Sequence, residues 1–202
     1  MRKIIFTRVV FMLGLALLPA MAMAGQETYV IDDSHSFANW TIRHVVSKTS
    51  GTFNEIKGKI LIDRDNLANS SVDARINVLS VSSNHAKRDE HIKKEEYLDA
   101  GKFSEMHFVS SKVEATSPTE GVLTGTLTLH GVSKEISFPF KVLGFGKDPW
   151  GGFRTGIEAH TGIKASDYGF TWPLKPNAPV GDDIEITLLI EGVRNFPEPK
   201  PL

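Results

Sequence analysis

The residues of this sequence best suited to chemistry are its seven histidines and one dense polar group, Arg88-Asp89-x-His91. Histidine is the commonest metal ligand, and it exchanges a proton near neutral pH. An enzyme could use His91 as a general base that a neighbouring carboxylate orients. The same polar group could instead form a salt-bridged helix edge that holds the helix to the fold, or it could contact the polar head of a lipid. We favour the structural interpretation and keep the other two open.

The spacing of the histidines argues against a metal centre. No H-E-x-x-H motif occurs, and His85 and His91 lie six residues apart, which places them on different faces of a helix. The other histidines are scattered over separate segments: His35, His44, His107, His130 and His160. The chain has no cysteine, so thiolate ligands, thiol nucleophiles and disulfides are absent. We expect no metal site and no cofactor.

Two motifs of common enzyme classes are also missing. The sequence contains neither the nucleophile elbow G-x-S-x-G nor the phosphate-binding loop G-x-x-x-x-G-K-[ST]. We therefore expect no catalytic residues. The alternative is a hydrolase or isomerase that uses polar residues at the mouth of a barrel on a lipid-like substrate.

The elements that must position these residues are mostly strands, because apolar and polar residues alternate with a period of two. Alternation is clearest over residues 122–143, where two arms joined near Gly131 predict an antiparallel hairpin. Further strands are expected over 27–31, 37–46, 56–62, 72–78, 106–113, 153–163 and 184–190. Loops are expected over 47–51 and 144–152, and an irregular segment over 164–181. Residues 84–98 predict one helix, capped by Ser83 or Asn84.

Strands without intervening helices pair antiparallel, and eight of them can close into a barrel with room for a small ligand. Gly58 and Gly125 lie on the apolar faces of their strands, which indicates a bend or a close approach of backbone. Pro139 cannot donate to a strand ladder and indicates a bulge or an open seam. These features favour an all-β fold with one short helix, a bent and partly open barrel and not a flat two-sheet sandwich. The pattern alone does not decide between the two architectures.

Residues 1–24 have the layout of a secretory signal peptide. Arg2, Lys3 and Arg8 precede the apolar run 9–18, and Ala22-x-Ala24 is a cleavage site of small residues. The run is shorter than the roughly 20 apolar residues of a spanning helix, so we expect no membrane span. Residues 25–202 then form a single domain in the periplasm. The formal net charge of −1 shows no basic excess, and nucleic acid is not an expected partner.

Short motifs along nearly the whole chain resemble those of the YceI-like family. They are Tyr29-x-Ile31-Asp32-x-x-His35-Ser36, His44-x-Val46-Ser47, Gly51-x-Phe53, Gly58, Asn84-x-x-x-Arg88-Asp89-x-His91-Ile92, Leu98-Asp99, Gly125-x-Leu127-Thr128-x-His130-Gly131-Val132-x-Lys134, Asp148-Pro149-Trp150-Gly151 and Ser166-Asp167-Tyr168-Gly169. The resemblance implies an exported protein with an all-β fold, an extended antiparallel eight-stranded lipocalin-like barrel with one short helix. It also implies an apolar tunnel for a polyisoprenoid or similar amphiphile. A bound lipid of the prenyl quinone type is a further alternative that we keep open.

The apolar side of each strand supplies the expected tunnel wall. The predicted ligand-binding residues are Trp40, Ile42, Ile60, Phe108, Leu127, Leu129, Phe138, Ile157, Trp172, Ile186 and Leu188. The expected partner is a long-chain isoprenoid or amphiphilic lipid, and the sequence leaves homodimer formation open. A further alternative is a barrel filled by its own side chains that serves as an interaction module.

Overall fold

The computed structural model describes residues 25–195, so the expected signal peptide and the tail after residue 195 lie outside the described residues. The strands are β1 (Gln26–Ile31), β2 (Phe37–His44), β3 (Ser47–Phe53), β4 (Ile56–Asp63), β5 (Ser71–Asn77), β6 (Val81–Ser82), β7 (Glu105–Ala115), β8 (Glu120–Leu129), β9 (Val132–Lys147), β10 (Gly152–Lys164) and β11 (Val180–Asn195). The helix is α1 (Ala86–Ile92), and the 3-10 turns are η1 (Asp33–His35), η2 (Leu67–Asn69), η3 (Val78–Ser80), η4 (Ala165–Tyr168) and η5 (Trp172–Leu174). Within this range no helix is long and apolar enough to cross a membrane.

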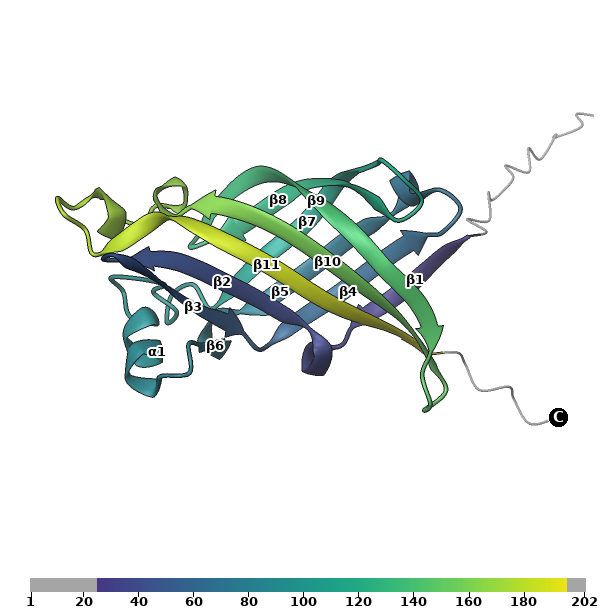
Figure 1. Cartoon of the computed structure of the whole chain (residues 1–202), viewed down its shortest axis with the longest axis horizontal. Coiled ribbons are helices and arrows are strands. Elements are labelled where there is room, and N and C mark those ends of the chain that lie inside the picture. Colours follow the sequence, from purple (N-terminus) through teal and green to yellow (C-terminus); the bar gives the residue numbers. More distant parts are fainter. Residues whose placement is uncertain (1–24, 196–202) are drawn as a thin grey trace, which may run out of the picture.

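Eight strands close into an elongated barrel, which confirms the predicted fold class (Figure 1). Their order is β1-β4-β5-β7-β8-β9-β10-β11 and back to β1, and every pairing is antiparallel. Strand β11 closes the ring because its last part pairs with β1. The first part of β11 pairs with β2. Strands β3 and β6 extend the sheet from β2 toward α1 at one end of the barrel.

The predicted hairpin is formed by β8 and β9. His130 and Gly131 make the two-residue connection with φ values of 52° and 75°, as a tight hairpin turn requires. The ladder runs without interruption from Leu129↔Val132 to Glu120↔Lys141. The apolar residues of both strands therefore face the barrel interior, as the alternation predicted.

Two glycines mark close approaches of backbone, as predicted. At Gly58, where φ is 152°, a Cβ atom would lie 2.2 Å from the carbonyl oxygen of Asp73 on β5. At Gly125 a Cβ atom would lie 2.4 Å from the carbonyl oxygen of Val109 on β7. A side chain at either position would force neighbouring strands apart, so these glycines allow the sheet to curl tightly.

The expected loop over 47–51 was wrong, because these residues form β3. Its sequence, SKTSGTF, carries few apolar side chains and so lacks the usual strand alternation. The reason is Trp40 on the paired strand β2, whose indole lies over Gly51. A Cβ atom there would come within 2.4 Å of the Trp40 ring, so one large side chain replaces the apolar residues expected on β3.

The expected helix over 84–98 was too long, and neither expected residue caps it. Helix α1 is preceded by Asn84 in the left-handed region at φ 59°, and the ring nitrogen of His85 accepts the amide proton of Arg88 at 3.2 Å. The helix ends at Ile92 because the chain reverses there, with the amide of Leu98 bonded to the carbonyl of Ile92 at 3.0 Å. This reversal turns Ile92, Tyr97 and Leu98 toward the cavity, which a straight helix would not do.

The expected loop over 144–152 is reduced to a tight turn between two long strands. Strand β9 continues to Lys147 and β10 begins at Gly152. Asp148 fixes the turn by accepting the amides of Trp150 and Gly152 at 2.9 and 2.7 Å. The segment 164–181 is irregular as predicted, although it contains η4 and η5 and the last strand begins at Val180.

Candidate functional site

The barrel encloses a cavity of about 440 Å³, within the usual range of small-molecule sites. Almost all of its lining is apolar. The structure places all eleven residues of the predicted wall on this cavity: Trp40, Ile42, Ile60, Phe108, Leu127, Leu129, Phe138, Ile157, Trp172, Ile186 and Leu188. Their contact with a ligand stays a prediction.

The wall residues meet because cross-strand partners on one face of a sheet lie side by side. Phe108 on β7 pairs with Leu127 on β8, and Trp40 on β2 pairs with Ile186 on β11. The rings of Phe108 and Phe138, two strands apart, have centroids separated by 5.5 Å. Closure of the ring brings these apolar faces together around one space.

Sequence reasoning missed other cavity residues. Ile136, Ile163 and Ile184 continue the apolar faces of strands that the alternation had already identified, so that signal could have found them. Leu98 and Phe170 also line the cavity but come from segments without strand or helix periodicity. No local pattern in the sequence points to those two.

The end of the barrel near the β9–β10 turn is closed by aromatic and charged side chains. Tyr29 is fully buried, and its hydroxyl donates to Glu27 at 2.5 Å; burial and this acid raise the pKa of the phenol. Glu27 also pairs with Arg64 and Arg194 at 3.6 and 2.7 Å. The Arg64 guanidinium lies 4.2 Å above the ring of Phe145, which neighbours Tyr29. Charged groups therefore cover the aromatic rings at this end.

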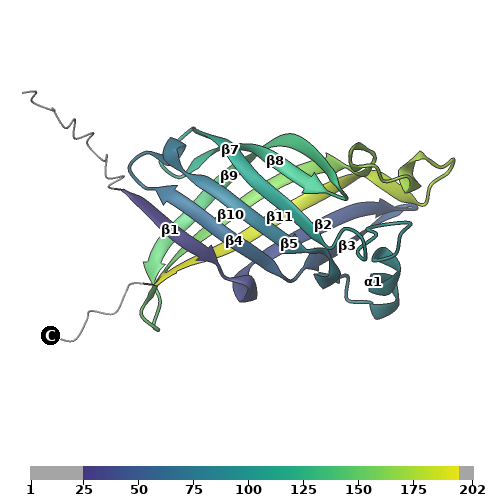
Figure 2. The same cartoon turned by 180° about the vertical axis from the view of Figure 1, so that it is seen from behind.

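The opposite end of the barrel is the one beside α1 (Figure 2). A chain of neighbouring rings lies at this end. Their successive centroids are 4.4, 4.4, 4.5, 5.3 and 4.9 Å apart in the order Phe103, His130, Phe170, Trp172, Tyr97 and His91. Trp172 is buried and its indole N–H donates to the carbonyl of Gly181 at 3.1 Å. We call this group the aromatic cover.

Of the polar group Arg88, Asp89 and His91, the side chains of Arg88 and His91 border the cavity beside α1. The Arg88 guanidinium donates to the hydroxyl and carbonyl oxygens of Ser83 at 2.7 and 2.6 Å, and the Ser83 hydroxyl in turn donates to Asp89. The His91 ring bonds Glu96 at 2.7 Å. Two of the three side chains therefore hold α1 to the chain after β6, which supports the structural interpretation.

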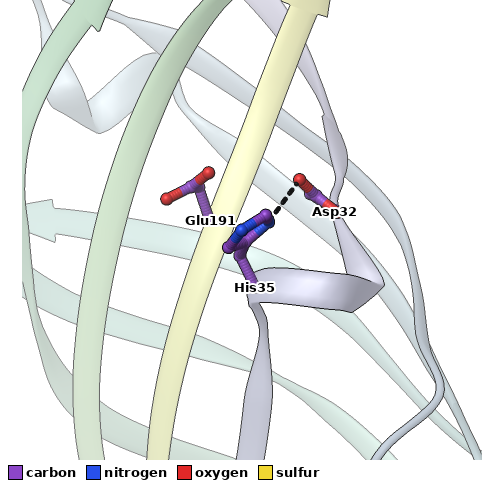
Figure 3. A group of neighbouring side chains, drawn as sticks. All are labelled: Asp32, His35 and Glu191. Carbon is purple, nitrogen blue, oxygen red and sulfur yellow. Dashed lines mark hydrogen bonds and ion pairs between the residues drawn. The ribbon is translucent and has the colours of Figure 1, made fainter. Parts of the chain in front are cut away.

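One group of metal-ligating side chains gathers within residues 25–195, at Asp32, His35 and Glu191 (Figure 3). Their ligand atoms lie within 4.8 Å of one another, and His35 bonds Asp32 at 2.9 Å. The Arg154 guanidinium contacts both carboxylates, at 2.7 Å from Asp32 and closer still to Glu191, and it also pairs with Asp148 at 2.9 Å. Since the Arg154 guanidinium already bonds both carboxylates, we interpret this group as an ion-pair network, and the expectation of no metal stays a prediction.

The network changes the ionisation of its members. Hydrogen bonds from Ser34, together with Arg154 and His35, hold the pKa of Asp32 well below its usual range. Burial raises the pKa of Asp148, but the Gly152 amide and Arg154 outweigh it and leave that pKa low. The three carboxylates raise the pKa of Arg154. Such shifts also occur in purely structural ion pairs.

The chain is similar to known proteins both in sequence and in fold. Residues 29–192 match the YceI-like domain. A UPF0312 protein of Ectopseudomonas mendocina is 40% identical over 185 residues, which cover 90% of this chain and 94% of the relative. The crystal structure of BcnA from Burkholderia cenocepacia has a TM-score of 0.72 at 20% identity, covering 80% of this chain and 98% of BcnA. A polyisoprenoid-binding domain of Saccharophagus degradans has a TM-score of 0.62 at 16% identity, covering 81% of this chain and 97% of that domain.

Proposed function

We propose that this protein, which belongs to the YceI-like family, binds the apolar chain of a polyisoprenoid or another long-chain amphiphile inside its barrel. It acts as a carrier or sequestering protein and not as an enzyme. The observation that carries the proposal is the cavity of about 440 Å³ with an apolar lining. The Saccharophagus domain, which shares this fold and is a polyisoprenoid-binding domain, supports the choice of ligand class.

The energetics favour an apolar occupant. Apolar burial contributes about 25 cal/mol per Å², so a prenyl chain that buries on the order of 400 Å² gains roughly 10 kcal/mol. Immobilising the chain and the protein offsets part of this gain, and we expect an affinity of about micromolar or tighter. A prenyl quinone meets these requirements and also quenches tryptophan fluorescence.

The test places a charge on the wall. Leu127→Asp puts a carboxylate in the apolar cavity, where an unpaired charge is costly, and is expected to abolish binding of a prenyl quinone followed by quenching of Trp40 and Trp172. Thr126→Asp, on the exposed face of the same strand, is the matched control and should bind like the parent. Circular dichroism checks that both variants fold. Equal binding by the two folded variants would show that the cavity is not the site.

The enzyme and interaction-module alternatives make different predictions for the purified protein. Native mass spectrometry and a solvent extract are expected to show a co-purified lipid of the isoprenoid or long-chain class. An empty protein that turns over an ester or isoprenoid substrate would favour the hydrolase or isomerase alternative. An empty protein that neither binds nor converts such compounds would favour the filled barrel.

Export is part of the proposal. We infer cleavage between Ala24 and Gly25 and residence in the periplasm, from the basic, apolar and small-residue order of residues 1–24. The intact mass of protein recovered from a periplasmic fraction is expected to begin at Gly25. Recovery of a chain that retains Met1 would contradict this part alone.

A further inference from the structure

The barrel wall has a gap in its hydrogen bonding between β9 and β10. Their ladder begins at Phe153↔Lys147 and stops at Ala159↔Phe140. Residues 132–139 of β9 and 160–164 of β10 do not pair with each other, although the β8–β9 and β10–β11 ladders continue on either side. We call these two unpaired ranges the seam.

The sequence contains a reason for the seam. Pro139 is the first residue of β9 beyond the ladder and has no N–H to donate, so pairing cannot continue through it normally. The register also shifts between Gly156 and Ile157, which leaves Leu143 as an extra residue on β9. The bulge or open seam predicted from Pro139 is therefore confirmed.

Only a thin apolar layer separates the two sides of the seam. Outside lies a cleft lined by Lys134, Glu135, Ile136, Gly162, Ile163, Lys164, Asp167, Tyr168, Asp183, Ile184 and Glu185, which we call the outer cleft. Ile136, Ile163 and Ile184 line both this cleft and the cavity of the barrel. These three side chains, the septum, are one layer thick.

A surface ion pair and one hydrogen bond, between the His130 ring and the carbonyl of Tyr168 at 3.2 Å, bridge the seam. Lys134 on β9 pairs with Asp167 on η4 at 2.9 Å, but the two side chains are 41% and 50% exposed, and such a pair contributes little. Tyr168 is 1% exposed, and its hydroxyl has no hydrogen-bond partner among the described residues. A buried hydroxyl without a partner is unfavourable, so an opening that wets it removes a cost of the closed state.

We propose that the seam is a lateral portal through which the apolar chain of the amphiphile passes between β9 and β10, while its polar head stays in the outer cleft. The proposal rests on the proposed function, since it needs an apolar occupant of the barrel. Opening the seam displaces the septum, the Lys134–Asp167 ion pair and the hydrogen bond between the His130 ring and the carbonyl of Tyr168, and it breaks no β9–β10 ladder bond. The aromatic cover and α1 lie across the adjacent end of the barrel, so the lateral route avoids displacing packed rings.

The absence of cysteine in the chain makes a direct test simple. The double variant Lys134→Cys/Asp167→Cys, bridged by a bifunctional thiol reagent, locks the outer cleft. The matched control is Glu120→Cys/Lys141→Cys, which replaces an exposed ion pair of 3.0 Å on the paired β8–β9 ladder. Stopped-flow quenching of tryptophan by a short-tailed prenyl quinone is expected to show association and dissociation both slowed at least about tenfold by the seam bridge, with Kd unchanged within about twofold. The bridged control should exchange like the parent.

The outcomes separate the portal from the function. Equal rates in the bridged seam variant and the bridged control would overturn the portal while binding in the cavity remained. No quenching in the unmodified protein would overturn the proposed function, and the portal with it.

Two single variants test the portal without a bridge. Ile136→Ala thins the septum and should speed both association and dissociation. Lys134→Gln removes the ion pair and should speed both by up to about fivefold, whereas Lys141→Gln should not. Unchanged rates in both seam variants would contradict the portal.

Discussion

The two ends of the barrel are held together by different interactions. At the β9–β10 turn, Arg154 is 23% exposed and contacts three carboxylates, those of Asp32, Asp148 and Glu191, which are 17%, 6% and 32% exposed. At the α1 end, closely packed, tilted rings and single exposed ion pairs such as Lys134–Asp167 take this role. We call the first the ionic end and the second the aromatic end.

This difference separates a fixed end from an adaptable one. A guanidinium that bonds several partly buried carboxylates constrains several strands at once, since no member can leave without exposing an unpaired charge. Aromatic contacts and surface ion pairs tolerate small displacements at lower cost. Because the seam lies toward the aromatic end, we interpret the seam side of that end as the part that adapts when the cavity is filled.

The largest effect is expected from Arg154→Met. Removing the cation leaves three carboxylates close together, and loss of one partner from a partly buried ion pair costs about 3 kcal/mol of unfolding free energy. Lys141→Met, which breaks one exposed pair, should cost less than about 1 kcal/mol. Urea unfolding measures both. Equal effects of the two substitutions would show that the ionic end is not specially stabilised.

Acid should weaken the ionic end first. A carboxyl whose pKa is lower in the folded state stabilises the fold above its unfolded-state value of about 3.9, and this contribution is lost as the pH falls through the folded-state value. Asp32 and Asp148 both have lowered pKa values. We therefore expect the unfolding free energy to fall below about pH 4, and less steeply in Arg154→Met.

Hydrogen exchange gives the spatial readout of this acid effect. Protection in β1 and the start of β10 should decline before protection in β2 and η4. Earlier loss at the aromatic end would contradict the contrast between the ends.

A smaller and local effect is expected from Trp172→Phe. The substitution keeps most of the ring contacts but leaves the carbonyl of Gly181 without its indole donor, a loss of about 1 kcal/mol. Hydrogen exchange should quicken around η5 and the start of β11 while the ionic end stays unchanged. Exchange that quickens equally at both ends would show that the ends are coupled and not independent.

The smallest effect is expected from His91→Ala. The His91 ring is half exposed, bonds Glu96 at 2.7 Å and contacts Tyr97 edge-on, so its loss should cost at most about 1 kcal/mol. We expect faster loss of a bound prenyl quinone and no loss of a chemical activity. A variant that retained the ligand but lost a measurable turnover would instead support a catalytic role for this histidine.

The sequence alone determined the eight strands of the barrel and their inward faces. Alternation with a period of two assigns each residue of a strand to one face wherever that face is apolar, so Leu127, Phe138 and Ile186 could be placed on the cavity without coordinates. Pro139 has no backbone N–H to donate, and this property acts wherever a proline occurs. Gly131 can adopt a positive φ, which is likewise a property of the residue itself.

The tertiary structure decided everything that depends on partners distant in the sequence. Strand β3 was missed because its inward face is filled by Trp40 of another strand, and Arg154 gains three carboxylate partners from separate elements. Phe170 and Leu98 reach the cavity through chain reversals that no periodicity records. The length of the seam also follows from how two strands diverge in space. Local patterns fix which face a side chain takes, whereas closure of the barrel fixes which side chains meet, because it joins residues whose separation along the chain carries no signal.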